Sequence, residues 1–219
     1  MIGIQLDGDW GAVAVWRESR AEVIGTGSSI AELVAIAKTQ REDCDVGIIG
    51  VRAWYNDEQR KQIQTKAKEA DISDIKLLNE PSASVFAYGV AQAGLPGTSM
   101  VLHVSRSRAF DVTVLTRNGN RFEILGTNGL AEIENSAPDQ FFAVIEPAVN
   151  QAISDAQVAP QSLDAIIITG CVEPLRSIAT QIEANWELAP VEPPDAETAI
   201  AYGAAVYGGF LESRQSCAT

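Results

Sequence analysis

The order of its secondary-structure signals is the feature that most constrains how this chain can fold. Short apolar runs with the length of buried strands alternate with amphipathic stretches. The strands expected in the first part are 2–6, 12–16, 22–24, 46–51 and 75–78. The helices expected there are 30–40, with Ile30, Leu33, Val34 and Ala37 on one face, 56–70 and 81–94. This alternation favours an α/β fold.

The same order of strands and helices returns after the break at Pro96-Gly97. The expected strands are 100–104, 110–115, 122–126 and 165–169, and the expected helices are 138–156, 173–186 and 196–211, the last capped by Asp195. The 219 residues therefore divide into two similar lobes. Lobe I is expected at 1–94 plus 195–212, lobe II at 95–194, and a frayed tail at 213–219.

Charge and cysteine content exclude several classes of function. The formal net charge is −13, which predicts no nucleic-acid partner and no anionic membrane partner. No apolar run reaches membrane-spanning length, and the first residues turn polar too early for a signal peptide. Cys44, Cys171 and Cys217 are widely spaced beside a single histidine, so we expect no metal site and a reducing, cytoplasmic compartment.

Five sequence blocks follow one another in a recognisable order. They are Ile2–Leu6, Val51–Arg60 (like V-P-A-Y-F-N-D-x-Q-R), Phe110–Leu115, Ile166–Gly170 and Ala199–Ala205 (like A-V-A-Y-G-A-A). Together with the segment Asn79–Gly89, they resemble the nucleotide-binding domain of the Hsp70 chaperone family, within the actin/hexokinase-like ATPase superfamily. The resemblance implies an actin-like ATPase (ribonuclease H-like) fold with two lobes facing across a cleft. It also implies a C-terminal helix that packs back onto lobe I.

The first phosphate loop departs from the family pattern. In the family, an Asp on the first strand helps to hold hydrated Mg²⁺, whereas this chain has the neutral amide of Gln5. Where the family has Gly and two Thr, this chain has Asp7, Gly8 and Asp9. Carboxylates at a polyphosphate position would repel the ligand by several kcal/mol, roughly. A polar hairpin turn and a metal-binding carboxylate pair are the two interpretations of Asp7 and Asp9.

The second phosphate loop and the adenosine motif depart further. The family's D-L-G-G-G-T-F-D aligns with 104–111, so that Arg106, Ser107 and Arg108 replace the three glycines. Those glycines let the backbone approach the phosphate, whereas the two arginines could hold an anion, or an acidic partner, only by their side chains. In the motif G-G-x-x-R, Gly170 is kept, but Cys171 replaces the second glycine and Pro174 the arginine.

Two insertions that the resemblance implies are missing. Only residues 25–29 stand where the family inserts a subdomain carrying its catalytic Lys, and the insertion near the adenine is missing between about 130 and 138. Both outer subdomains are therefore expected to be absent. Glu80 aligns with a family residue that contacts metal and water, but it also suits a helix N-terminus.

These observations predict a degenerate Hsp70-like domain that no longer hydrolyses ATP and needs no cofactor. Its expected role is that of a scaffold or regulatory subunit bound to a protein partner or to itself, because removing the outer subdomains uncovers apolar surface. The alternative is a chaperone or weak ATPase that binds ATP or ADP with Mg²⁺ in the cleft through the residues above. A filament-forming actin relative is a third hypothesis.

Overall fold

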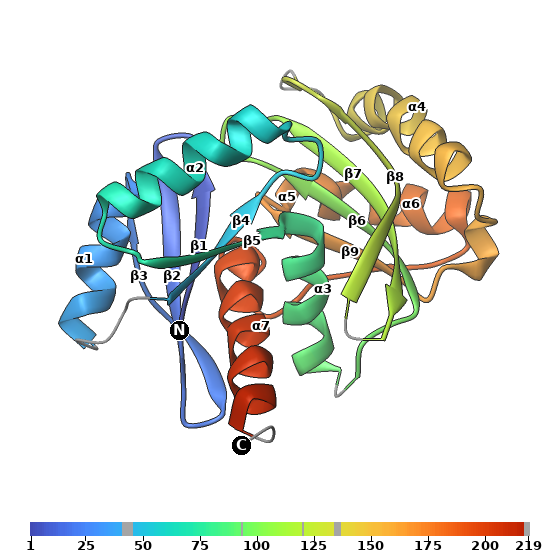
Figure 1. Ribbon diagram of the computed structural model, residues 1–219. Helices are drawn as coiled ribbons and strands as arrows, with labels where there is room; N and C mark the ends of the chain where they lie inside the picture. Colours follow the sequence, from blue (N-terminus) through green and yellow to red (C-terminus); the bar gives the residue numbers. More distant parts are fainter. Residues whose placement is uncertain (41–45, 93, 120, 134–136, 217–219) are drawn as a thin grey trace. The chain divides into compact units, whose positions relative to one another are not determined.

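The computed structural model describes residues 1–40, 46–92, 94–119, 121–133 and 137–216 (Figure 1). Contacts divide the chain into unit 1, which comprises Met1–Ala87 and Thr198–Thr219, and unit 2, which comprises Tyr88–Glu197. The sequence places the first boundary after Gly94, past the end of helix α3 (Glu80–Ala91), whereas the contacts place it within that helix.

Unit 1 is built on a five-stranded sheet in the order β3-β2-β1-β4-β5. Its strands are β1 (Ile2–Asp7), β2 (Trp10–Arg17), β3 (Arg20–Gly27), β4 (Val46–Val51) and β5 (Asp74–Asn79). The first three form antiparallel hairpins, and β4 and β5 continue the sheet in parallel from β1. Parallel strands end at the same edge, so the β1–β2 turn and the residues after β4 lie at one edge of the sheet.

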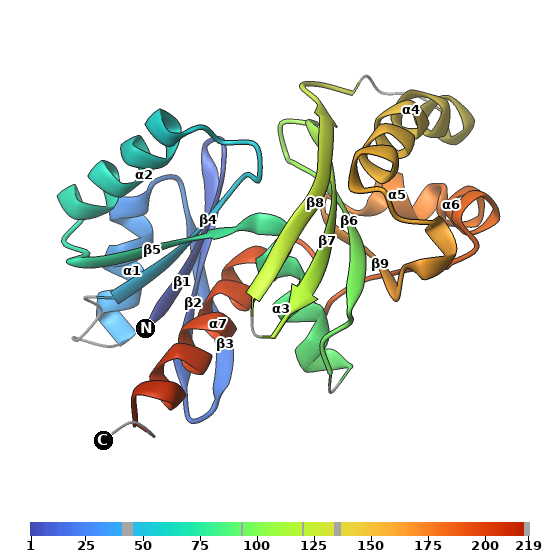
Figure 2. The same cartoon turned by 45° about the vertical axis from the view of Figure 1, so that its right-hand side comes forward.

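Helices α1 (Ile30–Gln40) and α2 (Asp57–Glu69) follow the predicted bounds closely. The buried face of α1 consists of the four predicted apolar residues. Asn56 caps α2 in a capping box: its side chain accepts from the Gln59 N–H, and the Gln59 side chain accepts from the Asn56 N–H. Figure 2 shows α1 and α2 on one side of the sheet and α7 (Ala199–Ser216) on the other.

The helix α7 lies unusually close to both β1 and α3. A Cβ atom added to Gly3 would lie 2.3 Å from the Ala201 carbonyl oxygen, and one added to Gly203 would lie 1.8 Å from the Ala83 carbonyl oxygen of α3. The small residues of the predicted last helix therefore serve backbone contact. The prediction of its bounds was only approximate, because α7 begins at Ala199 and continues to Ser216. Asp195 does not cap it, since this residue lies in the preceding turn with φ +52°.

Unit 2 repeats the topology of unit 1, with the sheet order β10-β9-β6-β7-β8. The strands are β6 (Thr98–Val104), β7 (Phe110–Asn118), β8 (Arg121–Leu130), β9 (Ala165–Gly170) and β10 (Pro190–Val191). Again the first three are antiparallel, and the last two extend the sheet in parallel. The short strand β10 was not predicted, because its two residues lie in a proline-rich stretch that indicates a break.

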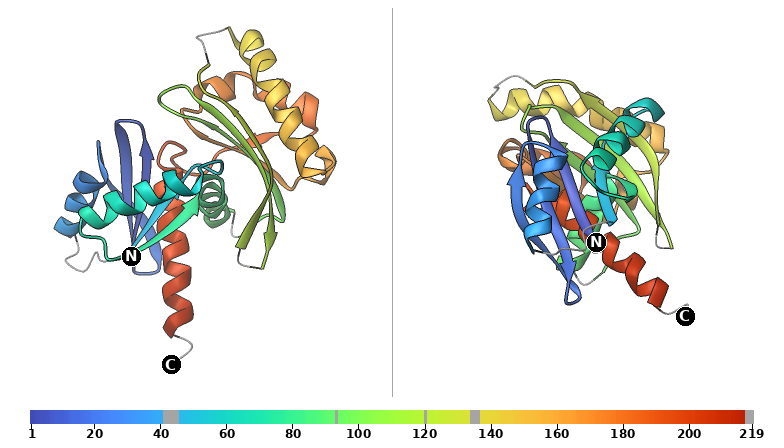
Figure 3. Two further views of the ribbon diagram at one scale, coloured as in Figure 1. Left: turned by 45° about the horizontal axis from the view of Figure 1, so that its top comes forward. Right: turned by 60° about the vertical axis from the view of Figure 1, so that its left-hand side comes forward.

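Helices cover one face of the second sheet (Figure 3). The long helix α4 (Pro138–Ala156) has the predicted bounds, and a short 3₁₀ helix, η1 (Pro160–Ser162), follows it. The single helix predicted over 173–186 is wrong. It is two helices, α5 (Glu173–Ser177) and α6 (Ala179–Trp186), that meet at Ile178, where φ is −114° and ψ is 14°. This bend leaves Leu175, Ile178 and Ile182 all fully buried.

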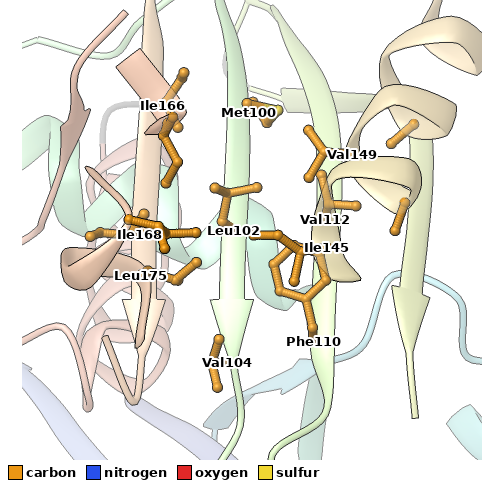
Figure 4. Packing of buried hydrophobic residues seen from close by; sticks show 14 of the residues in the cluster. Met100, Leu102, Val104, Phe110, Val112, Ile145, Val149, Ile166, Ile168 and Leu175 are labelled. Carbon is orange, nitrogen blue, oxygen red and sulfur yellow. The ribbon is translucent and has the colours of Figure 1, made fainter. Parts of the chain in front are cut away.

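The core of unit 2 lies between the sheet and these helices. Figure 4 shows apolar side chains from three neighbouring strands packed against α4 and α5. Met100, Leu102 and Val104 alternate along the central strand β6, so one face of that strand lies in the core. This core positions the loop after β6, which carries several of the candidate site residues.

The close contact of α7 with α3 can be tested by adding one methyl group. Gly203→Ala should lower the free energy of unfolding by about 2–3 kcal/mol, because the new Cβ meets backbone that cannot move aside. Alanine is otherwise the better helix former by about 1 kcal/mol, so any loss reports the clash. Urea unfolding measures the change. Gly94→Ala is the control, since nothing lies within 4 Å of its added Cβ. Equal stability of the two variants would contradict this packing.

Candidate functional site

The ten predicted site residues fall into two groups of five, one in each unit. Unit 1 holds Gln5, Asp7, Gly8, Asp9 and Glu80, and unit 2 holds Arg106, Ser107, Arg108, Gly170 and Cys171. Each group lies where the strands of its own sheet end. The first belongs to the β1–β2 hairpin and the start of α3, and the second to the ends of β6 and β9.

The first phosphate-loop position forms a tight two-residue hairpin. Asp7 pairs with Trp10, so only Gly8 and Asp9 form the turn. Gly8 has φ +66°, a conformation that favours glycine, and both turn residues are exposed. The turn that the resemblance assigned to phosphate binding is therefore a compact polar hairpin.

Asp7 forms an ion pair with an arginine that the sequence analysis did not select. Its Oδ1 lies 3.8 Å from Arg52 Nη2, and the two side chains are only 6% and 14% exposed. Arg52 also lies over the ring of Trp54, with its guanidinium carbon 5.9 Å from the ring centroid. Arg52 stands where the resembled motif has proline. The replacement of that proline by arginine is visible in the sequence, and it places a cation beside the carboxylate of Asp7.

Gln5 and Glu80 are both buried near the same edge. The Gln5 side chain is buried, and its Oε1 accepts a hydrogen bond of 3.3 Å from the Ala201 N–H in the first turn of α7. N–H groups at this position of a helix have no partner within the helix, so Gln5 serves as a remote cap. Glu80 begins α3, where a negative charge favours the helix dipole. Its backbone carbonyl accepts from the hydroxyl of Ser84.

The loop between β6 and β7 is held by hydrogen bonds among its own residues. The Arg108 N–H donates to the Ser105 carbonyl at 2.9 Å, and the Ala109 N–H donates to Ser105 Oγ at 2.9 Å. The hydroxyl groups of Ser105 and Ser107 lie 2.9 Å apart. Phosphate-binding loops aim such N–H groups at the ligand. In this loop, the N–H groups of Arg108 and Ala109 are both used internally.

The two arginines of this loop differ in their surroundings. Arg106 Nη2 donates to Glu197 Oε2 at 3.0 Å, in an ion pair with both side chains about half exposed. Arg108 occupies the position of a glycine in the resembled motif, and its φ of +65° is one that glycine favours. The backbone thus retains a glycine-like conformation at which a side chain costs about 1–2 kcal/mol.

Gly170 is required by packing at the end of β9. Its φ is +80°, and an added Cβ would lie 2.2 Å from the Val104 carbonyl oxygen. The neighbouring Cys171 is half-buried, and its N–H donates to the Val104 carbonyl at 2.8 Å. His103 is buried in β6, with Nδ1 3.1 Å from Thr169 Oγ1. Its position agrees with a structural role.

Comparisons with known proteins agree with the motifs. The family model described as Hsp70 protein matches residues 26–140, more than half of the chain. The chain belongs to the Hsp70 family. Its α/β architecture, with two mixed sheets of the same order, is the actin-like ATPase fold of that family.

Relatives of this Hsp70-family chain include bacterial and plant proteins. Chaperone protein HscA of Cronobacter sakazakii is 33% identical over 139 residues, which are 61% of this chain and 22% of that protein. The HscA homolog of Bordetella petrii is 29% identical over 143 residues, 63% of this chain and 22% of the relative. Heat shock 70 kDa protein BIP3 of Oryza sativa subsp. japonica is 33% identical over 99 residues, 45% and 15% respectively. The chain thus spans less than a quarter of each relative's length.

The expected losses of sequence relative to the family fall at two connections. Only Ser28 and Ser29 separate β3 from α1, and residues 131–137 separate β8 from α4.

Within the described ranges, no three His, Cys, Asp or Glu side chains gather as a metal site would require. None of the described helices is long and apolar enough to span a membrane. Cys44 and Cys217 lie outside the described residues.

The Asp7–Arg52 pair can be tested through stability. Asp7→Asn removes a negative charge from beside a largely buried guanidinium. We expect the free energy of unfolding to fall by about 2 kcal/mol, less than for a shorter buried pair. Asp9→Asn, in the exposed turn, should change it by less than about 0.5 kcal/mol. Urea unfolding of both variants measures the difference, and equal effects would refute the pairing.

The backbone of the β6–β7 loop provides a second test. Arg108→Gly should be more stable than Arg108→Ala by about 1 kcal/mol, because only glycine adopts φ +65° without a steric cost. Both variants remove the same guanidinium, so charge does not enter the comparison. Thermal unfolding at one pH is the measurement. If the alanine variant were the more stable, the loop would not have this conformation.

Proposed function

We propose that this chain is a degenerate Hsp70-like domain that does not hydrolyse ATP and serves as a protein-interaction, scaffold or regulatory subunit. The observation that carries the proposal is the Asp7–Arg52 ion pair. In the family, the first phosphate loop offers neutral donors to a polyphosphate. Here its position carries a nearly buried carboxylate with its own cation, so a bound phosphate would have to displace an internal salt bridge.

The second phosphate loop supports the same proposal. The hydroxyl groups of Ser105 and Ser107 bond to each other, the Arg108 and Ala109 N–H groups donate to Ser105, and Arg106 is paired with Glu197. A phosphate that used these groups would first have to break their present contacts. Unit 2 also carries 14 acidic and five basic residues, so its field repels polyanions. A protein partner or a second copy of the chain fits this chemistry better than a nucleotide does.

Nucleotide titration tests the proposal directly. With 1 mM ATP or ADP and excess Mg²⁺, we expect no change in the melting temperature. A dissociation constant of about 10 μM would stabilise the chain by about 2.7 kcal/mol under these conditions, which corresponds to roughly 5 °C or more. An Hsp70 nucleotide-binding domain that keeps the glycine-rich loops is the positive control. A shift of that size for this chain would refute the proposal and favour the nucleotide-binding alternative.

A further inference from the structure

The loop between β4 and α2 exposes a tryptophan on a firmly held backbone. Trp54 is 50% exposed, although the loop beneath it is fixed by the side chain of Arg60 from α2. Arg60 Nε donates to the Tyr55 carbonyl at 3.0 Å, and Nη2 donates to Asn79 Oδ1 at 2.9 Å and to the Ala53 carbonyl at 3.4 Å. This side chain therefore ties the loop to the end of β5.

Further contacts hold the indole ring itself. The Tyr55 N–H donates to the Arg52 carbonyl at 3.1 Å, which closes the turn that carries Trp54. The two aromatic rings pack edge to face, with their centroids 5.1 Å apart. The capping box at Asn56 fixes the other end of the loop. A large side chain that is already ordered loses little entropy when a partner binds, and tryptophan is enriched at the centres of protein interfaces.

The charges around Trp54 determine what kind of group it suits. Arg52 lies against one side of the ring and is largely buried, and Asp7 neutralises its charge. Two exposed carboxylates follow the loop directly, and the exposed Lys61 lies one helical turn further along α2. Asp57 and Glu58 form the first turn of α2, directly after the loop, and the Asp7–Arg52 contact brings the hairpin turn with Asp9 to the same edge. Asp57 and Glu58 thus follow the turn that carries the exposed ring, and Asp9 lies at the same edge of the sheet; these three carboxylates form the acidic border of the site.

From this arrangement we infer that Trp54, with the carboxylates of Asp9, Asp57 and Glu58, is a docking site for a basic segment of a partner protein. A Lys or Arg side chain of the partner stacks on the exposed part of the indole, and neighbouring basic residues pair with the carboxylates. The acidic border rejects phosphate-bearing partners, in keeping with the net charge of −13. The inference rests on the proposed protein-interaction function and names the site and partner chemistry for it.

A short basic peptide tests this site. The probe is a hexa-arginine peptide, titrated by calorimetry into the full chain at about 0.15 M and again at about 0.3 M salt, because any acidic protein attracts cations at low salt. Trp54→Ala should weaken binding about tenfold at both salt concentrations, within the range of a cation–π contact. Trp54→Phe keeps an aromatic face and should weaken binding about threefold at most. Asp57→Asn with Glu58→Gln should weaken it mainly at the lower salt concentration.

The matched control is Phe210→Ala. Phe210 is 49% exposed on α7, so this variant removes an aromatic side chain of equal exposure from another surface of unit 1. Phe210→Ala should bind hexa-arginine with the affinity of the unchanged chain. A hexa-glutamate peptide should bind neither to the unchanged chain nor to this variant. Melting temperatures of all variants show that each is folded.

Three results would overturn the docking site. The first is that the unchanged chain does not bind hexa-arginine. The second is that Trp54→Ala binds the peptide as tightly as the unchanged chain does. The third is that Phe210→Ala weakens binding as much as Trp54→Ala does. None of these results would affect the proposed function, which the nucleotide titration tests separately on the same samples. A thermal shift with ATP and Mg²⁺ would refute the proposed function regardless of the peptide result.

Discussion

The contact between the first strand and the last helix is the constraint on which the rest of unit 1 depends. Gly3 and Ala201, about two hundred positions apart in the sequence, meet there at backbone distance, and a Cβ atom at Gly3 would not fit without a shift. Gly203 of the same helix lies equally close to Ala83 of α3. The Gln5 amide extends this contact by capping the first turn of α7. A residue that the family resemblance relates to metal binding is therefore part of the structural link between the two ends of the chain.

The same edge of the sheet carries a second consequence, one of charge. A carboxylate placed at Asp7 is costly in a largely buried position unless a cation accompanies it. Arg52 supplies that cation from the end of the neighbouring parallel strand, at a distance of 3.8 Å from Asp7 Oδ1 that makes an ion pair without a hydrogen bond. The paired Arg52 also lies over the ring of Trp54, so that the cation beside the indole already has a negative partner in Asp7. The features proposed to exclude phosphate and those proposed to bind a partner thus arise from one local arrangement.

Local sequence patterns were sufficient for most of the elements. The spacing of Ile30, Leu33, Val34 and Ala37 predicted both the bounds of α1 and its buried face, because helical periodicity is a short-range property. The capping box at Asn56 is equally local. The bend at Ile178 and strand β10 were missed, since they depend on how distant segments pack. The ion pair between Asp7 and Arg52 joins residues 45 positions apart, and only the departure from the proline of the motif indicated it.

In the second phosphate loop, the backbone conformation and the ligand-binding groups are determined by different residues. Arg108 retains a backbone conformation suited to glycine, and Gly170 remains glycine because the Val104 carbonyl leaves no room for a side chain. The path of the chain through this region is thus determined by the pairing of β6 with its neighbours, whatever the side chains of the loop are. Ligand chemistry depends instead on donors that point away from the loop. The Arg108 and Ala109 N–H groups donate to Ser105 while β6 stays paired with β7 and β9, so this strand pairing is compatible with the loss of phosphate contacts that we propose.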